Sequence, residues 1–398
     1  MAAATTADVV VIGLGAAGAA AAYQLSRRGS RVIALDRHHP PHDRGSSHGG
    51  SRITRQAIGE GDEYVPLALR AHRLWREIEG ETGESLMLTT GALVIGRPET
   101  AAIHTGKPGK PDFVRNTIGA ARRFRIPHEV LDAEEAARRF PTFHPGGEET
   151  VYFEPGAGLL FPERCVAAQI DLARRHGALI RTGETALNIT EESAGVRVVT
   201  DAGAYSAAQV VVAAGAWAGG LLGGEHAARL STWRQVMHWF EPSVPEAFSP
   251  DRFPVFIWMH GAAPQDWFYG FPLLPGERAV KIAEDRFDAP LSGPEAQTQI
   301  IDPAEPGAMW ARHVPGRLSG VTDRRARSIA CLYTMAPASR FLIGRDPRRE
   351  RVILVSACSG HGFKHSAAIG ELVAQLACDA EPPALLAPFA IDVPAVLT

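Results

Sequence analysis

The feature that most constrains the fold is the glycine-rich stretch at residues 8–36. A short apolar run, Val9–Ile12, leads into Gly13, Gly15 and Gly18, which fit the pattern G-x-G-x-x-G before an alanine-rich run. Gly13 permits a turn that a Cβ would obstruct, Gly15 lets the backbone approach a pyrophosphate, and Gly18 lets a helix pack close to a strand. The stretch therefore predicts a strand, a tight turn, a helix and a second strand.

The end of the same stretch predicts what the turn binds. Residues 31–36 read Arg-Val-Ile-Ala-Leu-Asp, a second strand that ends in an acid. Asp36 would accept hydrogen bonds from the ribose hydroxyls of an adenosine, while the helix N-terminus would offer N–H groups and its positive dipole end to phosphates. We predict a dinucleotide site, and this stretch by itself does not separate FAD from NAD.

Length and composition allow a large core and exclude some classes of partner. A chain of 398 residues, 45% of them hydrophobic, can build two domains or one interlocked body. A net charge of −3 gives no electrostatic case for nucleic acid or an anionic membrane, and no segment is long and apolar enough to span a bilayer. The apolar run at residues 9–22 is explained by the dinucleotide turn, so we expect no signal peptide.

The cysteines indicate the compartment. They have neither metal-ligand spacing nor the density of a disulfide-rich protein, which suits a reducing environment. We therefore expect a cytoplasmic protein without a metal site. The four cysteines are Cys165, Cys331, Cys358 and Cys378.

The rest of the chain alternates between two kinds of pattern. Residues 40–55 are too rich in Gly, Pro and polar residues for a regular element, and they form a loop where a cofactor's phosphates or ring would lie. Residues 210–217 form a buried strand that runs into a glycine turn, either as a second wall of the cofactor site or as a plain sheet strand. Aromatic, alternating segments at 233–285 suggest an antiparallel sheet with one face toward a pocket.

Three separated segments then need a joint explanation: 45–55, 330–333 and 359–364. Together they resemble the monomeric sarcosine oxidases and their relatives that act on N-methyl amino acids. The resemblance runs along nearly the whole chain and includes Gly59-Glu-Gly-Asp-Glu-Tyr-Val-Pro-Leu-Ala-Leu69 and Tyr269-Gly-Phe-Pro272. It implies FAD rather than NAD, and an amine oxidation that uses oxygen and makes hydrogen peroxide. The implied partners are a small amino acid and O2, with the chain as a monomer.

The resemblance also implies an α/β fold. A Rossmann-type FAD-binding domain is interleaved with an α+β substrate domain built on a mainly antiparallel sheet. The expected FAD-binding segments are 1–88, 152–218 and 334–398, and the expected substrate-domain segments are 89–151 and 219–333.

Residue by residue, the resemblance assigns a substrate side. Arg55 and Lys364 match the two cations that hold the substrate carboxylate, since a guanidinium makes a planar two-point contact and an ammonium adds a second point charge. Lys281 matches the lysine that lies over the flavin and promotes oxygen reduction, where a cation would stabilise the developing negative charge. The other matches on this side are the pocket tyrosines Tyr269 and Tyr333, and Gly360, whose backbone carbonyl would lie near the substrate amine.

A cofactor side follows in the same way. Cys331 matches the cysteine whose sulfur is joined covalently to the flavin, although a cysteine in an apolar strand is by itself usually inert. The other matches around the flavin are His48, Arg52, His361 and Gly362.

One position departs from the family pattern. Asp285 stands where sarcosine oxidases carry a histidine, four residues after Lys281, and its carboxylate either favours a cationic substrate or points away. The alternatives that stay open are an oxidase of primary, D- or cyclic amino acids, an amine dehydrogenase with another acceptor, a nicotinamide-dependent reductase and a flavin-binding module without activity.

Overall fold

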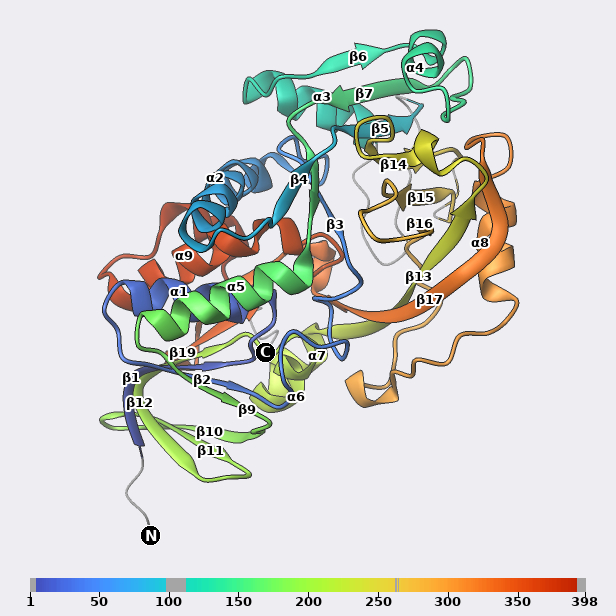
Figure 1. Cartoon of the computed structure of the whole chain (residues 1–398). Helices are drawn as coiled ribbons and strands as arrows, with labels where there is room; N and C mark the ends of the chain where they lie inside the picture. The colour runs from blue at the N-terminus through green and yellow to red at the C-terminus, as the bar shows by residue number, and fades with distance from the viewer. Residues whose placement is uncertain (1–4, 98–111, 262, 264, 392–398) are drawn as a thin grey trace, which may run out of the picture.

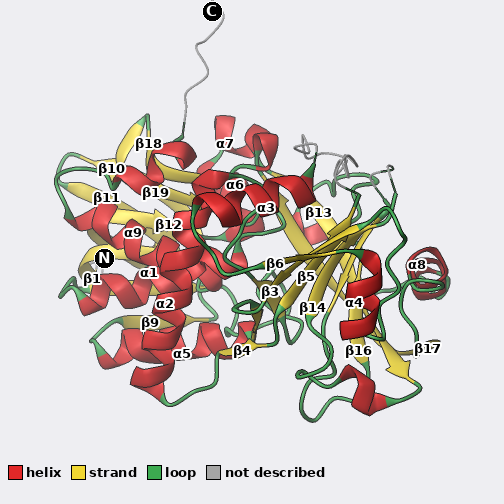
Figure 2. Cartoon of the chain, turned by 90° about the horizontal axis from the view of Figure 1, so that it is seen from above, coloured by secondary structure: helices red, strands yellow, loops and turns green. Residues whose placement is uncertain are grey.

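The computed structural model describes residues 5–97, 112–261, 263 and 265–391. The described chain forms two lobes, each built on its own sheet, with a small third sheet where the chain passes from one to the other (Figure 1). Seen from above, the helices gather over the first sheet, and the strands of the second sheet fan out beside them (Figure 2). This arrangement confirms the predicted α/β class with a second, sheet-based lobe.

The first sheet has a parallel centre, as the glycine-rich stretch predicts. β1 (Thr5–Ile12) pairs in parallel with β2 (Val32–Asp36) and with β12 (Ala204–Val212). β9 (Leu179–Thr182) and β19 (Arg349–Ser356) extend it in parallel on either side. The antiparallel additions are β10 (Ala186–Glu192), β11 (Gly195–Thr200) and β18 (Leu342–Asp346).

Helices cover this sheet in a close-packed layer. α1 (Ala16–Arg27) contacts α5 (Pro162–Arg175) and α9 (Ser366–Cys378), and α9 contacts α2 (Val65–Thr82). The small residues of α1 permit the contact with α9, because a Cβ on Gly370 would lie only 2.4 Å from that of Ala20. Close packing of this kind fixes α1, and with it the glycine turn that precedes it.

The second sheet is antiparallel throughout except for one parallel pair. Its order is β17 (Val321–Met335), β13 (Ser231–Pro242), β16 (Val280–Ala283), β15 (Trp267–Gly270), β14 (Val255–Met259), β5 (Ala92–Gly96), β7 (Thr150–Glu154) and β6 (Glu129–Leu131). Only β14 and β5 run in parallel among these described neighbours. The prediction of a mainly antiparallel sheet is therefore confirmed.

Three short strands form the third sheet. β3 (Arg52–Thr54) and β4 (Met87–Thr89) both pair with β8 (Gly158–Leu160). The prediction that residues 40–55 contain no regular element was wrong at their end, because β3 completes this sheet despite its polar sequence.

The remaining helices are short and lie around the second lobe and at the end of β12. They are α3 (Phe113–Arg123), α4 (Ala133–Arg139), α6 (Ala218–Leu222), α7 (Gly224–Arg229) and α8 (Glu305–His313). No helix within the described ranges is long and apolar enough to cross a membrane.

Three of the predicted domain boundaries fall inside strands. The boundary at 88/89 lies in β4, that at 151/152 lies in β7, and that at 333/334 lies in β17. The predicted domains also include residues 1–4, 98–111 and 392–398, which lie outside the described residues. The division at those residues stays a prediction.

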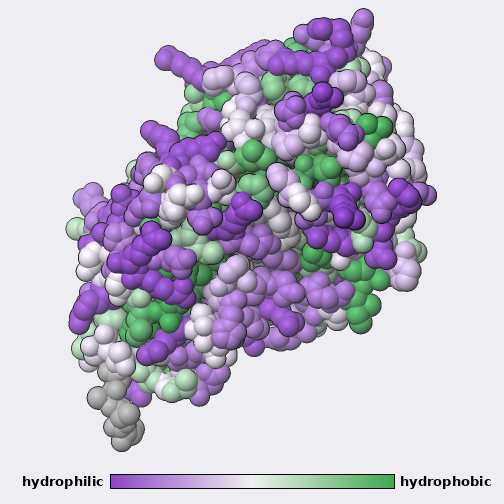
Figure 3. All heavy atoms as spheres, in the orientation of Figure 1, coloured by the Kyte–Doolittle hydropathy of each residue, from purple (hydrophilic) through white to green (hydrophobic). Residues whose placement is uncertain are grey.

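The surface in the orientation of Figure 1 is mostly hydrophilic. Hydrophobic residues show in scattered patches, between wide areas of polar side chains (Figure 3). Scattered apolar surface of this kind is normal for a globular protein and needs no partner to explain it.

Candidate active site

One cavity collects residues from all three sheets. Its volume is about 580 Å³, within the range of small-molecule and cofactor sites. It is lined by the turn after β1, the end of β12, β3, β14, β15 and the loop after β19. One cavity therefore connects the glycine turn of the first sheet with residues of the second and third sheets.

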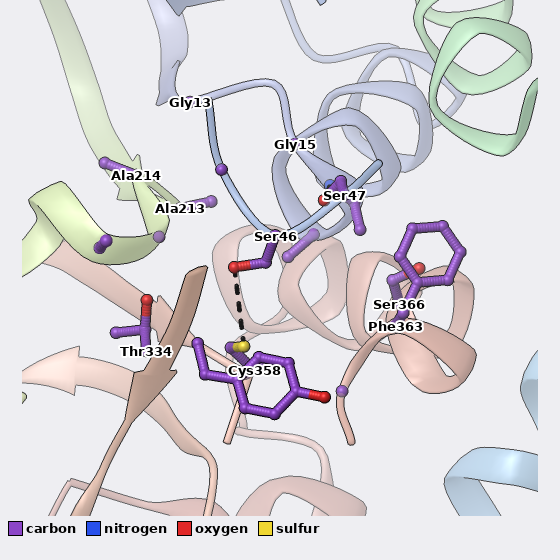
Figure 4. A pocket seen from close by; sticks show the side chains of 18 of the residues that line it. Gly13, Gly15, Ser46, Ser47, Ala213, Ala214, Thr334, Cys358, Phe363 and Ser366 are labelled. Carbon is purple, nitrogen blue, oxygen red and sulfur yellow. Dashed lines mark hydrogen bonds between the residues drawn. The ribbon is translucent and has the colours of Figure 1, made fainter. Parts of the chain in front are cut away.

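The glycine turn forms one end, and its geometry explains each glycine. Gly13 has a φ of +90°, and a Cβ there would lie 2.6 Å from the carbonyl oxygen of Ala213. A Cβ on Gly18 would lie 1.7 Å from the carbonyl oxygen of Gly13, so this position needs glycine for the helix to start here. The end of β12 therefore supplies the second wall that the sequence left open, with Ala213 and Ala214 facing the turn (Figure 4).

Asp36 lies at the same end, buried at the tip of β2. Its carboxylate accepts hydrogen bonds from the backbone N–H of Leu14 at 2.7 Å and of His38 at 2.8 Å. Burial would raise the pKa of Asp36, but the contact with His42 and these two N–H bonds outweigh it and lower the pKa. Asp36 is thus a fixed anion that lines the cavity and holds the turn, and its Oδ2, which accepts from Leu14 N, can accept a second hydrogen bond from a ligand hydroxyl.

The lining of this end fits a bound FAD. The hydroxyls of Thr334 and Ser366 are buried, belong to residues that line the cavity, and have no hydrogen-bond partner among the described residues. The first turn of α1 carries no acidic side chain, so its positive dipole end can attract a phosphate. Ser47 Oγ accepts from Ala16 N at 3.1 Å and so brings the loop at residues 40–55 against this helix end (Figure 4).

Arg55 and Lys364 line the other end of the same cavity. Arg55 is almost fully buried; it donates to Glu60 Oε2 at 2.6 Å and to the carbonyl of Ala57, and it lies over the ring of Phe113. Lys364 is also buried and donates to the carbonyl of His361 at 2.7 Å. Two cations from distant segments thus converge on one space, and a carboxylate is the ligand that such a pair binds best.

A buried glutamate fixes the chain that follows Arg55, and the sequence did not reveal it. The fully buried Glu154 accepts from the N–H groups of Gln56 and Ala57 at 2.7 and 3.1 Å, and so fixes the chain that follows Arg55. Burial raises the pKa of Glu154 although these bonds oppose the shift. Neither Glu154 nor Glu60 was singled out, because nothing local in the sequence marks a buried strand glutamate or a loop glutamate as a partner of Arg55.

The loop before Lys364 is wound tightly around small residues. Gly360 has a φ of +74°, and a Cβ on Gly362 would lie 1.5 Å from the carbonyl oxygen of Ala357. Trp75 Nε1 donates to the carbonyl of Lys364 at 3.4 Å and ties this loop to α2. Gly360, His361 and Gly362 all line the cavity as a result.

A carboxylate and two phenols complete this end. The hydroxyl of Tyr333 donates to Asp285 Oδ1 at 3.0 Å, and Tyr269 lines the cavity beside them. Burial and the Asp285 charge raise the pKa of both tyrosines, so both stay protonated at neutral pH. Trp267 and Phe271 add aromatic wall, so some aromatic residues at 233–285 do face a pocket.

A second layer lies behind the cavity wall. Arg52 lines the cavity, donates to the carbonyl of Ser46 at 2.8 Å and lies 3.7 Å from Cys331 Sγ. Lys281 Nζ donates to the carbonyls of Gly49 and Ser51 at 2.9 and 2.7 Å. Burial, with Arg52, holds the pKa of Lys281 well below its usual range. The ammonium form of Lys281 is therefore less favoured here than on a surface.

Cys331 and His48 belong to the same layer. Burial raises the pKa of the Cys331 thiol, with the Arg52 charge opposing the shift. Burial and Arg52 lower the pKa of His48 to about 4, so this histidine is neutral. The thiol that does line the cavity is that of Cys358, 3.8 Å from Ser46 Oγ (Figure 4). No motif in the sequence distinguishes Cys358 from the other cysteines.

The structure therefore divides the predicted site residues into two groups. Those that line the cavity are Gly13, Gly15, Asp36, Arg52, Arg55, Tyr269, Tyr333, Gly360, His361, Gly362 and Lys364. Those that are described but do not line it are Gly18, His48, Lys281 and Cys331.

Comparison with known proteins identifies a matching family model, related sequences and a similar solved structure. Residues 8–376 match the model of the FAD-dependent oxidoreductase family, DAO. The chain is 38% identical to a monomeric sarcosine oxidase of Streptomyces avermitilis over 94% of each chain, and 33% identical to an N-methyl-L-tryptophan oxidase of Yersinia pestis over 96% of this chain and 98% of the relative. Among solved structures, NikD, an unusual amino acid oxidase essential for nikkomycin biosynthesis, has a TM-score of 0.81 at 26% identity over 97% of each chain.

Proposed function

This chain belongs to the DAO family of FAD-dependent oxidoreductases, and from that premise we propose that it oxidises a carboxylate-bearing secondary amine, sarcosine or another N-methyl amino acid. The electron acceptor is O2. Water and O2 enter, and formaldehyde, the demethylated amino acid and hydrogen peroxide leave.

The observation that carries this proposal is the position of Arg55 and Lys364. Both cations line the cavity that also contains the glycine turn and Asp36, so a small carboxylate and a dinucleotide can be bound in one space. A binding module without activity would have no need of two buried cations in the cavity that also contains the turn.

The residues of this chain bind and orient the substrate. Arg55 and Lys364 hold its carboxylate, and the loop at Gly360 lies beside its amine. Tyr269, Trp267 and Phe271 form an apolar wall that keeps water from the reacting carbon. When bound, FAD supplies the acceptor for the hydride that leaves this carbon. The amine gives up a proton as the C=N bond forms, and the imine is hydrolysed after it leaves.

The cofactor side carries two finer proposals. Cys331 would hold FAD through a covalent bond from its sulfur, and the adjacent Arg52 favours the thiolate of Cys331 against the effect of burial. Lys281 serves the reaction with O2, as the family resemblance implies, although its amine lies against the loop carbonyls of Gly49 and Ser51. We further propose that the enzyme works in the cytoplasm as a monomer.

An anaerobic screen of the holoenzyme tests the proposal. Sarcosine, other N-methyl amino acids, proline, pipecolate, D-alanine and a primary amine without a carboxylate are added in turn, and bleaching of the flavin absorbance is followed. We expect bleaching by an N-methyl amino acid and not by the amine without a carboxylate. Bleaching only by primary, D- or cyclic amino acids would favour another oxidase of the same family. Bleaching without peroxide after air is admitted would favour a dehydrogenase.

Reduction that is equally fast in Arg55→Ala would contradict the assignment of the carboxylate site. Arg164→Ala is the matched control, because Arg164 also stacks on a phenylalanine, Phe161, but does not line the cavity.

A further inference from the structure

We propose that Asp285 is a specificity-determining residue that receives the charged amine, so that the cavity binds its substrate as a zwitterion, with the carboxylate on Arg55 and Lys364 and the ammonium on Asp285. This inference rests on the proposed function and names the charge state of the substrate that the cavity selects.

The chain on both sides of Asp285 is fixed. The buried Glu284 lies 2.7 Å from Nε2 of His313, which is itself fully buried. Arg286 is held by Gln235, whose amide accepts from Arg286 N at 2.8 Å and donates to its carbonyl at 2.7 Å. Because its neighbours are anchored in this way, Asp285 presents its carboxylate to the cavity at a defined position.

The surroundings of this carboxylate suit a cation. Tyr333 gives Asp285 a neutral hydrogen-bond donor, and an ionised carboxylate can accept several hydrogen bonds at once. The nearby lining is aromatic, from Trp267, Tyr269 and Phe271, and aromatic faces also attract ammonium groups. In such a wall with few polar groups, opposite charges attract more strongly than in water.

Neither Tyr269 nor Tyr333 carries a negative charge that could bind an ammonium in place of Asp285. The pKa values of Tyr269 and Tyr333 are both raised, first by burial and then by Asp285. The tyrosines therefore remain neutral, and Tyr333 donates its hydroxyl proton to Asp285. At this end of the cavity the described acids are Asp285 and Glu60, and Glu60 is already bonded to Arg55.

This arrangement predicts a pH effect of known sign. The neutral amine is the form that is oxidised, and a carboxylate beside the ammonium raises the pKa of the bound amine. The rate of anaerobic flavin reduction should rise with pH through that pKa. In Asp285→Asn the rise should occur at lower pH, by about one unit or more, since an opposite charge at contact shifts a pKa by roughly that much.

A pair of ligands with the same shape and different charge tests the binding step directly. Trimethylglycine carries a fixed cation and cannot be oxidised as a neutral amine, and 3,3-dimethylbutanoate replaces its N⁺ by carbon. Their dissociation constants for the wild-type holoenzyme are measured from the change in flavin absorbance. We expect trimethylglycine to bind at least tenfold more tightly, and we expect this ratio to fall to near one in Asp285→Asn.

Asp288→Asn is the matched control, because it removes the same charge three residues along from an exposed side chain that does not line the cavity. In Asp288→Asn the ratio of the two dissociation constants should equal that of the wild type. Equal binding of the two ligands by the wild type, which needs no variant, would overturn the role of Asp285, as would a ratio that survives Asp285→Asn. Binding of neither ligand would instead refute the carboxylate site of Arg55 and Lys364, on which both proposals rest.

Discussion

The ion pair between Arg55 and Glu60 sets up a competition that one substitution can measure. Glu60 is a carboxylate of this chain, 2.6 Å from a guanidinium nitrogen that we assign to the substrate's carboxylate, and both residues line the cavity. A substrate must therefore share or displace an internal anion. Glu60→Gln removes the charge and keeps the shape, so it should increase the affinity for carboxylate ligands.

The size of the increase follows from the geometry. A hydrogen bond to a charged group contributes roughly 1.5–3 kcal/mol. Arg55 is almost fully buried, but the side chain of Glu60 is 20% exposed, so solvent screens the pair and the lower figure applies. About 1.5 kcal/mol corresponds to a roughly tenfold lower Kd for a carboxylate.

The same change should lower stability, because it leaves a buried cation with one partner fewer. Breaking a fully buried pair costs about 3–5 kcal/mol. Arg55 keeps its bond to the carbonyl of Ala57 and its contact with Phe113, and the new amide can still accept, so we expect a loss of about 1–2 kcal/mol. A saturating carboxylate ligand should restore Tm toward that of the wild type, since it returns an anion to Arg55.

The assay compares the Kd of 3,3-dimethylbutanoate from flavin absorbance with Tm measured with and without this ligand. Glu63→Gln is the control, because Glu63 lies three residues further along, in the 3-10 helix Asp62–Tyr64, and does not line the cavity. An affinity in Glu60→Gln that is unchanged or weaker would refute the competition and show that Glu60 helps to position Arg55 for the substrate.

Five further substitutions test the cofactor side. Gly18→Ala should give no folded protein, because its Cβ would overlap the carbonyl of Gly13. In Gly15→Ala the Cβ would meet only Ser47 Oγ at 3.4 Å, so the free energy of unfolding should change by no more than about 1 kcal/mol, while FAD binding should weaken about tenfold. Equal FAD content in Gly15→Ala and the wild type would contradict the close approach of a pyrophosphate. In Lys281→Met, the rate of flavin reduction by substrate should stay within a few fold of the wild-type rate, while reoxidation by O2 slows at least tenfold. If stopped-flow traces show that both steps slow alike, Lys281 has a structural role in the loop at Gly49 and Ser51. Acid-precipitated Cys331→Ala should be colourless while Cys358→Ala stays yellow, and the opposite pattern would assign the linkage to the thiol that lines the cavity.

The parts of this protein that sequence predicts well are those whose causes are local. The contact of Gly18 with the carbonyl of Gly13 and the positive φ of Gly13 lie within one βαβ unit, so the spacing of the glycines is enough to predict the turn. The contact of Gly13 with Ala213, after β12, is not local and was not predicted. The convergence of Arg55 and Lys364 depends on the whole topology, and only a resemblance that spans the chain could predict it.

Other features had no local cause and could not be predicted. The bonds from Glu154 to the residues after Arg55 join two segments across the junction of the lobes. The position of Lys281 behind the wall depends on the carbonyls of Gly49 and Ser51, which the sequence does not reveal. For Asp285, the sequence showed a departure from the family pattern, but its direction relative to the cavity became clear only from the contact with Tyr333.

The interleaving of the two lobes has a consequence for dissecting the molecule. The first sheet takes β1 and β2 from the start of the chain and β19 from near its end, while the strands of the second sheet come from between them. Any single backbone cut between β2 and β19 leaves the first sheet divided between two fragments. Neither fragment of such a cut can fold this sheet alone, and activity would return only if the two halves were co-expressed and reassembled.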